Sequence, residues 1–316
     1  MIGSLAVDVG KGACRAGWSV DGTEQTFGVG PGVPHISEPG ALEAIAGAIF
    51  AAAVAAGSPA DGVDCVCAGV TGLLEADHLA SRLARLLLDM LPARSAIVTG
   101  DVVTSHVGAF DGGSGVVVAA GTGSVALGVD PSGRHAKVDG QGYILGDQGS
   151  GFAVGQRGLA SAIRHYDGRG GSAVLASLAE RDLGPLDRLA AEIYASDNLP
   201  VTVASFAPAV AEAARRGDAE AIAIWSAVAD ELAVTATAAR DRLGWTDGDV
   251  PLSWTGSLFD AGDVLWGHFV ASIAARAPNM TVQPPRGNSL AGAARLARLG
   301  GAGLHRSLIS SSDATR

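Results

Sequence analysis

Short apolar runs alternate along the first third of the chain with segments whose apolar residues recur at helical spacing. The runs are typical of buried strands and lie at 5–9, 13–20, 63–70 and 95–100. The segments at 41–56 and 76–90 predict helices. A strand meander is expected to end at about Phe27, and a loop is expected from Gly28 to Glu38. Strands followed by alternating helices and strands predict a mixed sheet that is covered by helices.

The strand pattern restarts after a glycine-rich stretch at 112–115, with runs at 116–120 and 125–129. A strongly helical region follows, and its clearest helix is expected to begin after Asp218 and to stop at Gly244. The buried face of that helix is predicted to carry Ile222, Trp225, Val228 and Leu232.

The last part of the chain predicts one more strand, at 251–255, and a helix that begins near Asn288. Small residues in that helix would permit close packing against a neighbour. Residues 301–316, which include a run of serines, are expected to form a disordered tail.

Two glycine turns are notable because each joins a pair of predicted strands. The first reads Asp8-Val9-Gly10-Lys11-Gly12, and the second reads Gly121-Thr122-Gly123-Ser124. Glycine has no Cβ, so backbone N–H groups in such turns can approach the oxygens of a phosphate. The repeated design predicts two phosphate-binding turns.

The second turn also fits a dinucleotide-binding fingerprint, since residues 121–126 read G-x-G-x-x-A. That fingerprint requires a helix directly after the glycines. Residues 125–129 instead have the pattern of a strand, and Asp130-Pro131 follows as a turn. An oxidoreductase is therefore the least favoured of the functions considered.

Two aspartates stand at the ends of predicted strands, where α/β proteins place reactive groups. Asp8 ends the first strand and could hold a hydrated Mg²⁺ ion while the adjoining turn receives phosphate. Asp101 follows the strand at 95–100 and could accept the proton of an attacking hydroxyl group. Each has a structural alternative, Asp8 as a turn cap and Asp101 as the N-cap of a helix that opens at Val102.

Glycines alternate with polar and apolar residues between positions 140 and 151. A loop of this composition can hydrogen-bond a polyol, and Asp147 could accept from two adjacent hydroxyl groups. A surface turn is the alternative, although it explains the interleaved Tyr143, Ile144 and Leu145 poorly. We favour a ligand-binding loop.

Composition narrows the functional classes. The 316 residues include 22 basic and 32 acidic side chains, and the formal charge of −10 disfavours nucleic acid and anionic membranes as partners. The longest apolar stretch, 44–57, is shorter than the roughly 20 residues of a membrane span. The start of the chain lacks a signal-peptide pattern, and the three cysteines suit core positions rather than a disulfide framework. A cytoplasmic protein is expected.

Five segments, taken in order, resemble the amino-sugar kinases of the actin-like ATPase superfamily, in the branch of N-acetylglucosamine kinases and BadF/BadG-type ATPases. They lie at 8–12, 99–101, 120–124, 142–150 and 255–257, and the resemblance covers about residues 1–300. It is greatest to the actinobacterial glucosamine kinases.

The resemblance implies an α/β fold with two ribonuclease H-like domains and an interdomain cleft for ATP and sugar. The N-terminal domain would span 1–112 and be completed by the helix at 288–300. The C-terminal domain would span 113–287 and contain a helical insertion.

The same resemblance implies roles for individual residues. The nucleotide-binding residues would be Gly10, Lys11, Gly12, Thr122, Gly123, Gly256 and Ser257, with Asp8 as the Mg²⁺ ligand. The sugar-binding residues would be Asp101, Gly140, Gln141, Gly142, Asp147, Thr71 and His35. Asp101 would also be the catalytic base for the 6-hydroxyl group of the sugar.

The sequence departs from the family pattern Asp-x-Gly-Gly-Thr at Lys11 and Ala13, which leaves the metal geometry open. Gln141 stands where relatives often have tryptophan, and Asp139 is nearby in the sequence. A more polar wall would favour a free ammonium group over an acetamide. The expected activity is therefore ATP-dependent phosphorylation of glucosamine, which gives glucosamine 6-phosphate and ADP.

Other functions stay open. An N-acetylglucosamine kinase or a BadF-type ATPase would carry the same motifs. A sugar-responsive regulatory protein belongs to a different class, but such regulators usually carry a DNA-binding segment, and the first strand here begins by Leu5 with no room for one. The expected partners are an amino sugar and ATP, and a homodimer is left open.

Overall fold

The computed structural model describes residues 3–20, 23–34, 36–57, 62–75 and 77–314. Its internal contacts divide the chain into two compact units. The first contains Met1–Val117, Leu127–Ala136 and Gln283–Arg316, and the second contains Val118–Ala126 and Lys137–Val282. The helix at the end of the chain therefore belongs to the first unit, together with the N-terminal strands.

Six strands form the first sheet, in the order β11-β5-β4-β1-β2-β3. β1 and β2 form an antiparallel hairpin, whereas β4 lies parallel to both β1 and β5. The strands are β1 (Gly3–Val9), β2 (Ala13–Val20), β3 (Thr23–Pro31), β4 (Val63–Val70), β5 (Ala93–Gly100) and β11 (Ile309–Asp313).

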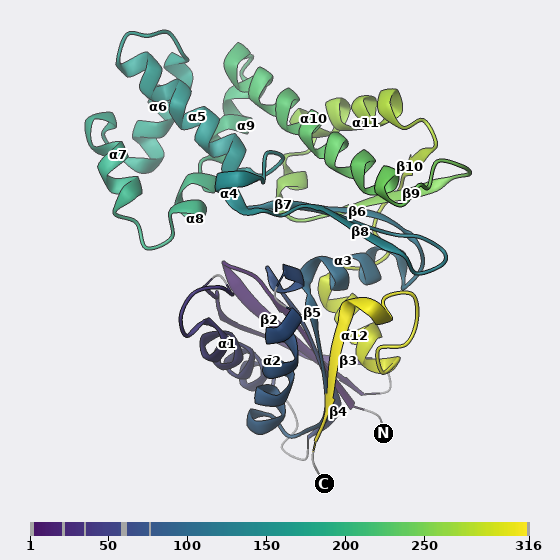
Figure 1. The fold of residues 1–316 in the computed structure, drawn as a ribbon. Coiled ribbons are helices and arrows are strands. Elements are labelled where there is room, and N and C mark those ends of the chain that lie inside the picture. The colour runs from purple at the N-terminus through teal and green to yellow at the C-terminus, as the bar shows by residue number, and fades with distance from the viewer. Residues whose placement is uncertain (1–2, 21–22, 35, 58–61, 76, 315–316) are drawn as a thin grey trace. The chain divides into compact units, whose positions relative to one another are not determined.

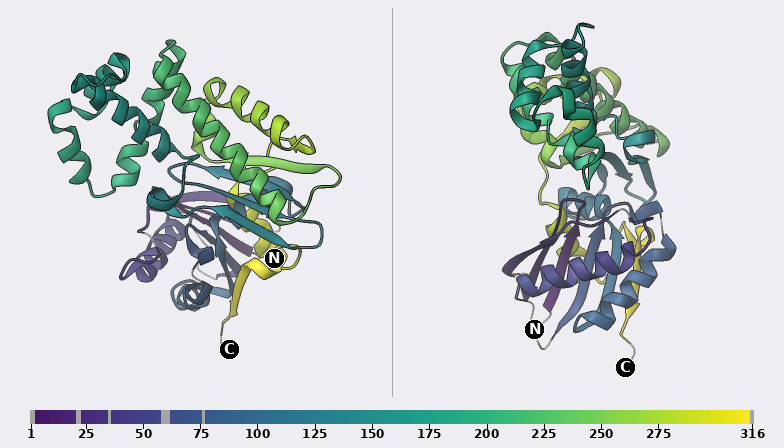
Figure 2. Two further views of the ribbon diagram at one scale, coloured as in Figure 1. Left: turned by 45° about the horizontal axis from the view of Figure 1, so that its top comes forward. Right: turned by 90° about the vertical axis from the view of Figure 1, so that its left-hand side faces the viewer.

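Helices cover both faces of this sheet, as Figures 1 and 2 show. α1 (Ala41–Ala55) and α2 (Asp77–Met90) pack on one face, where Leu5, Ile45 and Leu83 belong to the larger core. α3 (Asp101–Phe110) and α12 (Ser289–Arg298) contribute Val107 and Leu290 to a smaller core. Two short 3₁₀ helices complete the unit, η1 (Leu73–Glu75) and η3 (Arg306–Leu308).

Strand β3 is longer than the sequence predicts, because a loop was expected from Gly28 onward and the strand continues to Pro31. The glycines that suggested a loop serve close packing instead. A Cβ at Gly28 would lie 2.2 Å from the backbone nitrogen of Ala56, and one at Gly30 would lie 2.7 Å from the carbonyl oxygen of Ala48. Only glycine lets β3 pack this closely on α1.

The expectation of a disordered tail differs from the structure, in which residues 309–313 form an edge strand of the first sheet. β11 runs antiparallel to β5, with Ile309 opposite Thr99. The Thr99 hydroxyl group donates to the carbonyl oxygen of Leu308 at 2.6 Å, and Ile309 packs against the smaller core. The serine-rich segment is held mainly by backbone pairing, which an apolar pattern does not reveal.

The second sheet has the strand order β10-β9-β6-β7-β8. Its strands are β6 (Gly115–Ala120), β7 (Ser124–Val129), β8 (His135–Asp139), β9 (Val250–Thr255) and β10 (Met280–Val282). The helices between them are α4 (Gly142–Leu145), α5 (Gly151–Tyr166), α6 (Ala173–Leu183), α7 (Leu186–Tyr194), α8 (Leu199–Ala204), α9 (Ala207–Arg215), α10 (Ala219–Arg242), the 3₁₀ helix η2 (Ser257–Ala261) and α11 (Asp263–Arg276).

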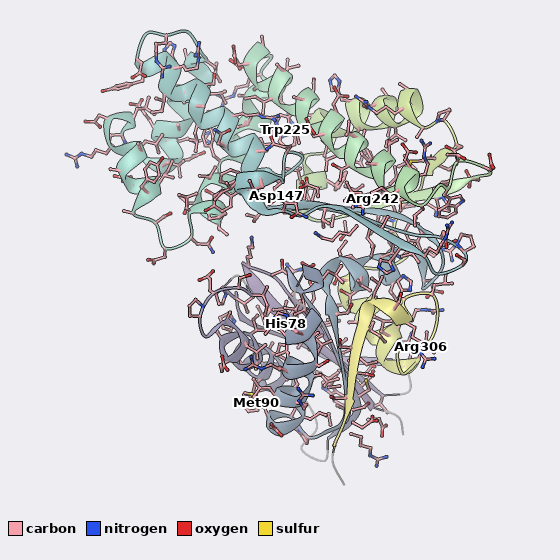
Figure 3. All side chains as sticks on the ribbon, viewed as in Figure 1. His78, Met90, Asp147, Trp225, Arg242 and Arg306 are labelled. Carbon is pink, nitrogen blue, oxygen red and sulfur yellow. The ribbon has the colours of Figure 1, made fainter. Side chains whose placement is uncertain are left out.

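The long helix α10 begins where the sequence predicts, because the Asp218 side chain accepts the N–H of Ala221 at 2.9 Å. Trp225, labelled in Figure 3, is buried together with Val228 and Leu232. Ile222 does not share that buried face and remains 42% exposed. Among the described residues, α10 is the one helix long and apolar enough to span a membrane, and 50% of its apolar window is buried. A core helix of this kind meets the same criterion.

Two histidines form a hydrogen-bonded pair inside the first unit. Nε2 of His106 lies 2.9 Å from the carbonyl oxygen of Gly115 and must be the donor, because a carbonyl only accepts. In a neutral ring Nδ1 is then the acceptor, so His305 Nε2 donates to it across 2.9 Å. Burial is the main cause that lowers the pKa of His106 to about 3 and that of His305 to about 4. Both rings are therefore neutral near pH 7.

We predict that this pair destabilises the protein in mild acid. Histidine in the unfolded state has a pKa of 6.5. Between pH 6.5 and about 4, the two histidines therefore bind protons in the unfolded state but remain neutral in the folded state. The free energy of unfolding should therefore fall below pH 6.5, by on the order of 1–2 kcal/mol per histidine at pH 5. Denaturant titrations between pH 5 and 8 measure this, and His305→Gln should flatten the profile. An equally steep profile in that variant would contradict the assignment.

Candidate active site

Three parallel strands of the first unit deliver predicted site residues to one edge of the sheet. Val9 pairs with Val70, and Val70 with Gly100, so the ends of β1, β4 and β5 lie level. Asp8, Thr71 and Asp101 stand at or directly after these ends. The structure thus brings together three residues that are far apart in the sequence, at the sheet edge where α/β proteins bind ligands.

The first glycine turn closes the hairpin between β1 and β2. The N–H of Gly10 donates to the carbonyl oxygen of Ala13 at 3.0 Å, and the carbonyl oxygen of Gly10 accepts from Val33 at 3.4 Å. Within the part of the chain that the structure describes, the N–H groups of Lys11 and Gly12 have no hydrogen-bond partner. A Cβ at Gly12 would meet no atom within 4 Å, so this stretch of backbone is open to a ligand.

In the second turn, the carbonyl oxygens of the three residues 121–123 each accept a hydrogen bond. Those of Gly121 and Thr122 accept from the first residues of α5, Gly151 at 2.8 Å and Phe152 at 3.1 Å, and that of Gly123 accepts from Gly121 at 2.9 Å. The N–H of Ser124 donates to Asp147 at 3.1 Å. Of the four N–H groups, those of Thr122 and Gly123 have no partner among the described residues.

The Asp147 side chain accepts a hydrogen bond from this turn. Its side chain is buried, and Figure 3 labels it in the second unit. Oδ1 accepts the N–H of Ser124, while the N–H of Asp147 donates to Asp139 Oδ1 at 2.9 Å. Asp147 also has a φ of 58°, an uncommon conformation for a residue other than glycine. The observed role of this carboxylate is to shape the turn, and its predicted contact with sugar stays a prediction.

The end of β9 reaches the same turn. Gly256 has a φ of 100°, and a Cβ there would lie 2.2 Å from the carbonyl oxygen of Ala120. The next residue, Ser257, has its Oγ 4.0 Å from the Cβ position of Gly121. The second unit therefore brings together Thr122, Gly123, Gly256 and Ser257, which the sequence assigned to nucleotide binding.

Asp8 is held by a residue that the sequence analysis did not identify as functional. Ser289, the first residue of α12, donates its hydroxyl proton to Asp8 Oδ1 at 2.8 Å. Arg15 lies 3.9 Å from Oδ2, and its side chain is 68% exposed, so that ion pair is weak. Burial raises the pKa of Asp8, and the hydrogen bond from Ser289 opposes this shift. The helix start at Asn288 was the only sequence signal near Ser289.

A single carboxylate beside a phosphate-binding turn suits a hydrated Mg²⁺ ion. The Asp8 side chain is 23% exposed, and Oδ2 has only the distant Arg15 as a charged neighbour among the described residues. The described part of the chain holds no cluster of three or more His, Cys, Asp or Glu residues that could form a metal site by itself. The residues present therefore fit an ion that shares its ligands with a substrate.

Asp101 opens helix α3. Its Oδ1 accepts the N–H of the next residue, Val102, at 2.8 Å. The N-cap alternative is wrong, because the helix starts at Asp101 itself and its N-cap residue is Gly100, which has no side chain to cap with. This bond fixes the orientation of a carboxylate that stays partly exposed at the sheet edge. The catalytic role of Asp101 stays a prediction.

The remaining predicted sugar-binding residues are less well defined by the structure. Gln141 is exposed and precedes the short helix α4 as its N-cap residue. The sequence predicted a loop in this segment. Gly140 and Gly142 flank Gln141 with positive φ angles of 73° and 78°. His35 lies outside the described residues.

Two sheets with glycine turns at their strand ends define the fold class as that of the actin-like ATPases and ROK sugar kinases. A candidate N-acetylglucosamine kinase from Chromobacterium violaceum has a TM-score of 0.72 and 26% identity over 93% of this chain and 98% of that one. A ROK family glucokinase from Streptomyces griseus, in complex with glucose and AMPPNP, has a TM-score of 0.63 and 19% identity, over 94% of this chain and all of that one, 100%. The α/β fold expected from the sequence is thereby confirmed.

The chain belongs to the BadF/BadG/BcrA/BcrD ATPase family, whose sequence profile matches residues 5–295. It is also 28% identical to the N-acetylmuramic acid/N-acetylglucosamine kinase of Clostridium acetobutylicum over 204 residues. This aligned segment covers 64% of this chain and 67% of that protein. The superfamily expected from the five motifs is confirmed. The greater likeness to actinobacterial glucosamine kinases stays a prediction.

We predict that Gly123→Ala destabilises the second turn and that Gly121→Ala does not. A Cβ at Gly123 would lie 2.8 Å from Asp147 Oδ2, whereas one at Gly121 would meet Ser257 Oγ only at 4.0 Å. Displacing the buried Asp147 should lower the free energy of unfolding by about 1–3 kcal/mol. Urea denaturation of both variants measures the difference, and equal stability would show that Asp147 does not hold the turn.

Proposed function

We propose that this protein is an ATP-dependent kinase that phosphorylates the 6-hydroxyl group of an amino sugar. The observation that carries the proposal is the pair of consecutive N–H groups in each turn, Lys11 with Gly12 and Thr122 with Gly123, that have no partner among the described residues. Paired peptide N–H groups of this kind bind phosphate oxygens. Membership of an ATPase family supports ATP as the source of that phosphate.

Each turn has its own part in this proposal. The N–H groups of Lys11 and Gly12, with the Lys11 ammonium group, bind phosphate oxygens of ATP, and those of Thr122 and Gly123 bind others. Gly256 and Ser257 border the adenosine. Asp8 holds Mg²⁺, which when bound offsets the negative charge of the phosphates.

Asp101 is the proposed catalytic base. Its carboxylate accepts the proton of the sugar 6-hydroxyl group as the oxygen attacks the γ-phosphorus. The hydrogen bond from Val102 at 2.8 Å holds the carboxylate in one orientation, which favours a reproducible attack geometry. Thr71, the 140–142 turn, Asp147 and His35 are the proposed contacts for the rest of the sugar.

Two acceptors compete within this proposal, glucosamine and N-acetylglucosamine. The sequence favoured glucosamine because Asp139 could bind an ammonium group. In the structure, Asp139 Oδ1 accepts from the N–H of Asp147 at 2.9 Å, and Oδ2 accepts from Ser124 Oγ at 3.4 Å. These bonds occupy the carboxylate and weaken that reason. The kinases similar to this chain are named for N-acetylglucosamine, which supports the second acceptor equally.

A BadF-type ATPase that acts on another protein is the principal alternative within the enzymes, and a sugar-responsive regulator is the alternative outside them. The polar 140–142 turn supports a sugar acceptor rather than a protein. We propose a cytoplasmic location, in keeping with a small-molecule kinase that draws on the ATP pool.

The substrate panel tests this proposal directly. ADP release with Mg²⁺ and ATP should be at least about tenfold faster with glucosamine or N-acetylglucosamine than with glucose or without sugar. Mass spectrometry should identify a hexosamine 6-phosphate. ADP release that is equal with and without sugar would reject the kinase in favour of an ATPase, and the ratio between the two hexosamines decides the acceptor.

We predict that Asp101→Asn lowers kcat by about 100-fold or more while KM for ATP stays within about twofold. Asparagine can still accept the N–H of Val102, so helix α3 should remain folded. Steady-state kinetics with the preferred hexosamine measure both constants. Asp111→Asn, at the other end of α3, is the control and should keep kcat near normal. Comparable turnover of Asp101→Asn and this control would remove Asp101 from the base role.

A further inference from the structure

The buried hydroxyl groups of Ser289 and Thr104 connect Asp8 with the backbone of Asp101. Ser289 Oγ lies 2.8 Å from Asp8 Oδ1, and it lies 2.7 Å from Thr104 Oγ1. Thr104 Oγ1 in turn lies 2.9 Å from the carbonyl oxygen of Asp101. The chain of contacts joins the end of β1, the start of α12 and the first turn of α3, and Ser289 is 281 positions from Asp8.

The two hydroxyl groups have two protons for three short contacts. Each hydroxyl group has one proton, and Ser289 donates its proton to the Asp8 carboxylate. The Ser289 oxygen is then the acceptor toward Thr104, whose single proton lies between Ser289 Oγ and the Asp101 carbonyl oxygen. Thr104 is fully buried and Ser289 is 8% exposed, so water does not replace these bonds. Ser289 therefore gives its proton to Asp8 Oδ1, and the Thr104 hydroxyl group lies directly behind the Ser289 oxygen, with its own proton shared between that oxygen and the Asp101 carbonyl oxygen.

Tight backbone packing keeps the hydroxyl groups in place. A Cβ at Gly69 on β4 would lie 2.2 Å from Thr104 Oγ1, and a Cβ at Gly292 on α12 would lie 1.9 Å from the Thr104 carbonyl oxygen. Both positions therefore need glycine for α3 to approach β4 and α12 this closely. The approach of α3 and α12 is what brings Thr104 within hydrogen-bond distance of Ser289.

We propose that Ser289 and Thr104 are positioning residues, which orient the Asp8 carboxylate so that its second oxygen can bind the metal ion of the metal–nucleotide complex. Apart from Ser289, the described side chain that interacts with the Asp8 carboxylate is the exposed Arg15, at 3.9 Å. Without Ser289, the carboxylate would have no short bond from a described side chain to hold its orientation. This inference rests on the proposed function only in assigning Asp8 to the metal ion.

The chain contains a matched control for this idea. Ser4 and Ser19 form another buried hydroxyl pair on β1 and β2, with 2.9 Å between their oxygens, and within the described part of the chain neither hydroxyl group bonds to Asp8. Ser19→Ala and Ser289→Ala therefore remove the same group from similar surroundings. A purely structural role for Ser289 predicts that both variants behave alike.

The experiment compares Mn²⁺ binding to the full-length protein in the presence of ADP, followed by electron paramagnetic resonance. Ser289→Ala should raise the Kd for Mn²⁺ by about tenfold, as expected when a metal ligand loses its supporting hydrogen bond. With the hexosamine substrate, KM for Mg·ATP should rise while KM for the sugar stays within about twofold. Ser19→Ala should leave all three constants unchanged, even where its thermal midpoint falls as far.

A second pair of variants tests the same idea if Ser289→Ala does not fold. Thr104→Val keeps the shape of the side chain and removes its hydroxyl group, whereas Thr104→Ser keeps the hydroxyl group. The Kd for Mn²⁺ should rise in Thr104→Val and stay close to wild type in Thr104→Ser. If Thr104→Val matches Thr104→Ser, or Ser289→Ala matches Ser19→Ala, the positioning role is overturned.

Metal binding separates this proposal from the kinase assignment. If the wild-type protein binds Mn²⁺ with ADP but phosphorylates no hexosamine, the proposed function fails, and the comparison of variants still decides the role of Ser289. If the wild-type protein with ADP binds no Mn²⁺, the positioning role is overturned as well.

Discussion

The site depends on peptide N–H groups that follow the ends of strands and have no hydrogen-bond partner among the described residues. A backbone donor normally finds an acceptor inside the fold, so keeping two adjacent donors available requires the surrounding acceptors to be used elsewhere. In the second turn, α5 and the turn itself occupy the three carbonyl oxygens, and Asp147 takes the next donor. The helix start and the buried carboxylate thus leave the turn as a set of donors.

The first unit solves the corresponding problem with fewer contacts. Gly10 uses both of its backbone groups, toward Ala13 and Val33, and the N–H groups of Lys11 and Gly12 have no partner among the residues that the structure describes. The adjacent carboxylate of Asp8 is ordered from the opposite end of the chain, by Ser289 and through it by Thr104. Loop geometry and carboxylate geometry therefore depend on different elements, and a substitution can disturb one while leaving the other intact.

The sequence predicted the elements whose signals are local. The ends of β2 and β4, the cap at Asp218 and the helix start at Asn288 follow from hydrophobic spacing and capping chemistry, and the structure places them where expected. Asp8, Thr71 and Asp101 could be grouped because ends of parallel strands meet at one edge.

Contacts between distant segments gave no comparable signal. Ser289 looked like an ordinary residue of a helix start, β11 lacks apolar spacing, and the glycines of β3 suggested a loop although they allow contact with α1. Asp147 was assigned to sugar binding from its loop, and its backbone partners became visible only in three dimensions. In each case a tertiary contact outweighs the local preference of the residue.

The assignment of α12 and β11 to the first unit has a consequence during protein synthesis. A ribosome delivers β1 before α12 and β11, with the whole helical insertion between them. Until α12 and β11 emerge, one face of the nascent N-terminal sheet lacks α12, and the outer edge of β5 lacks β11. We therefore expect the growing chain to expose an apolar sheet face and an unpaired strand edge until these segments emerge. Chaperones at the ribosomal exit tunnel bind surfaces of this kind.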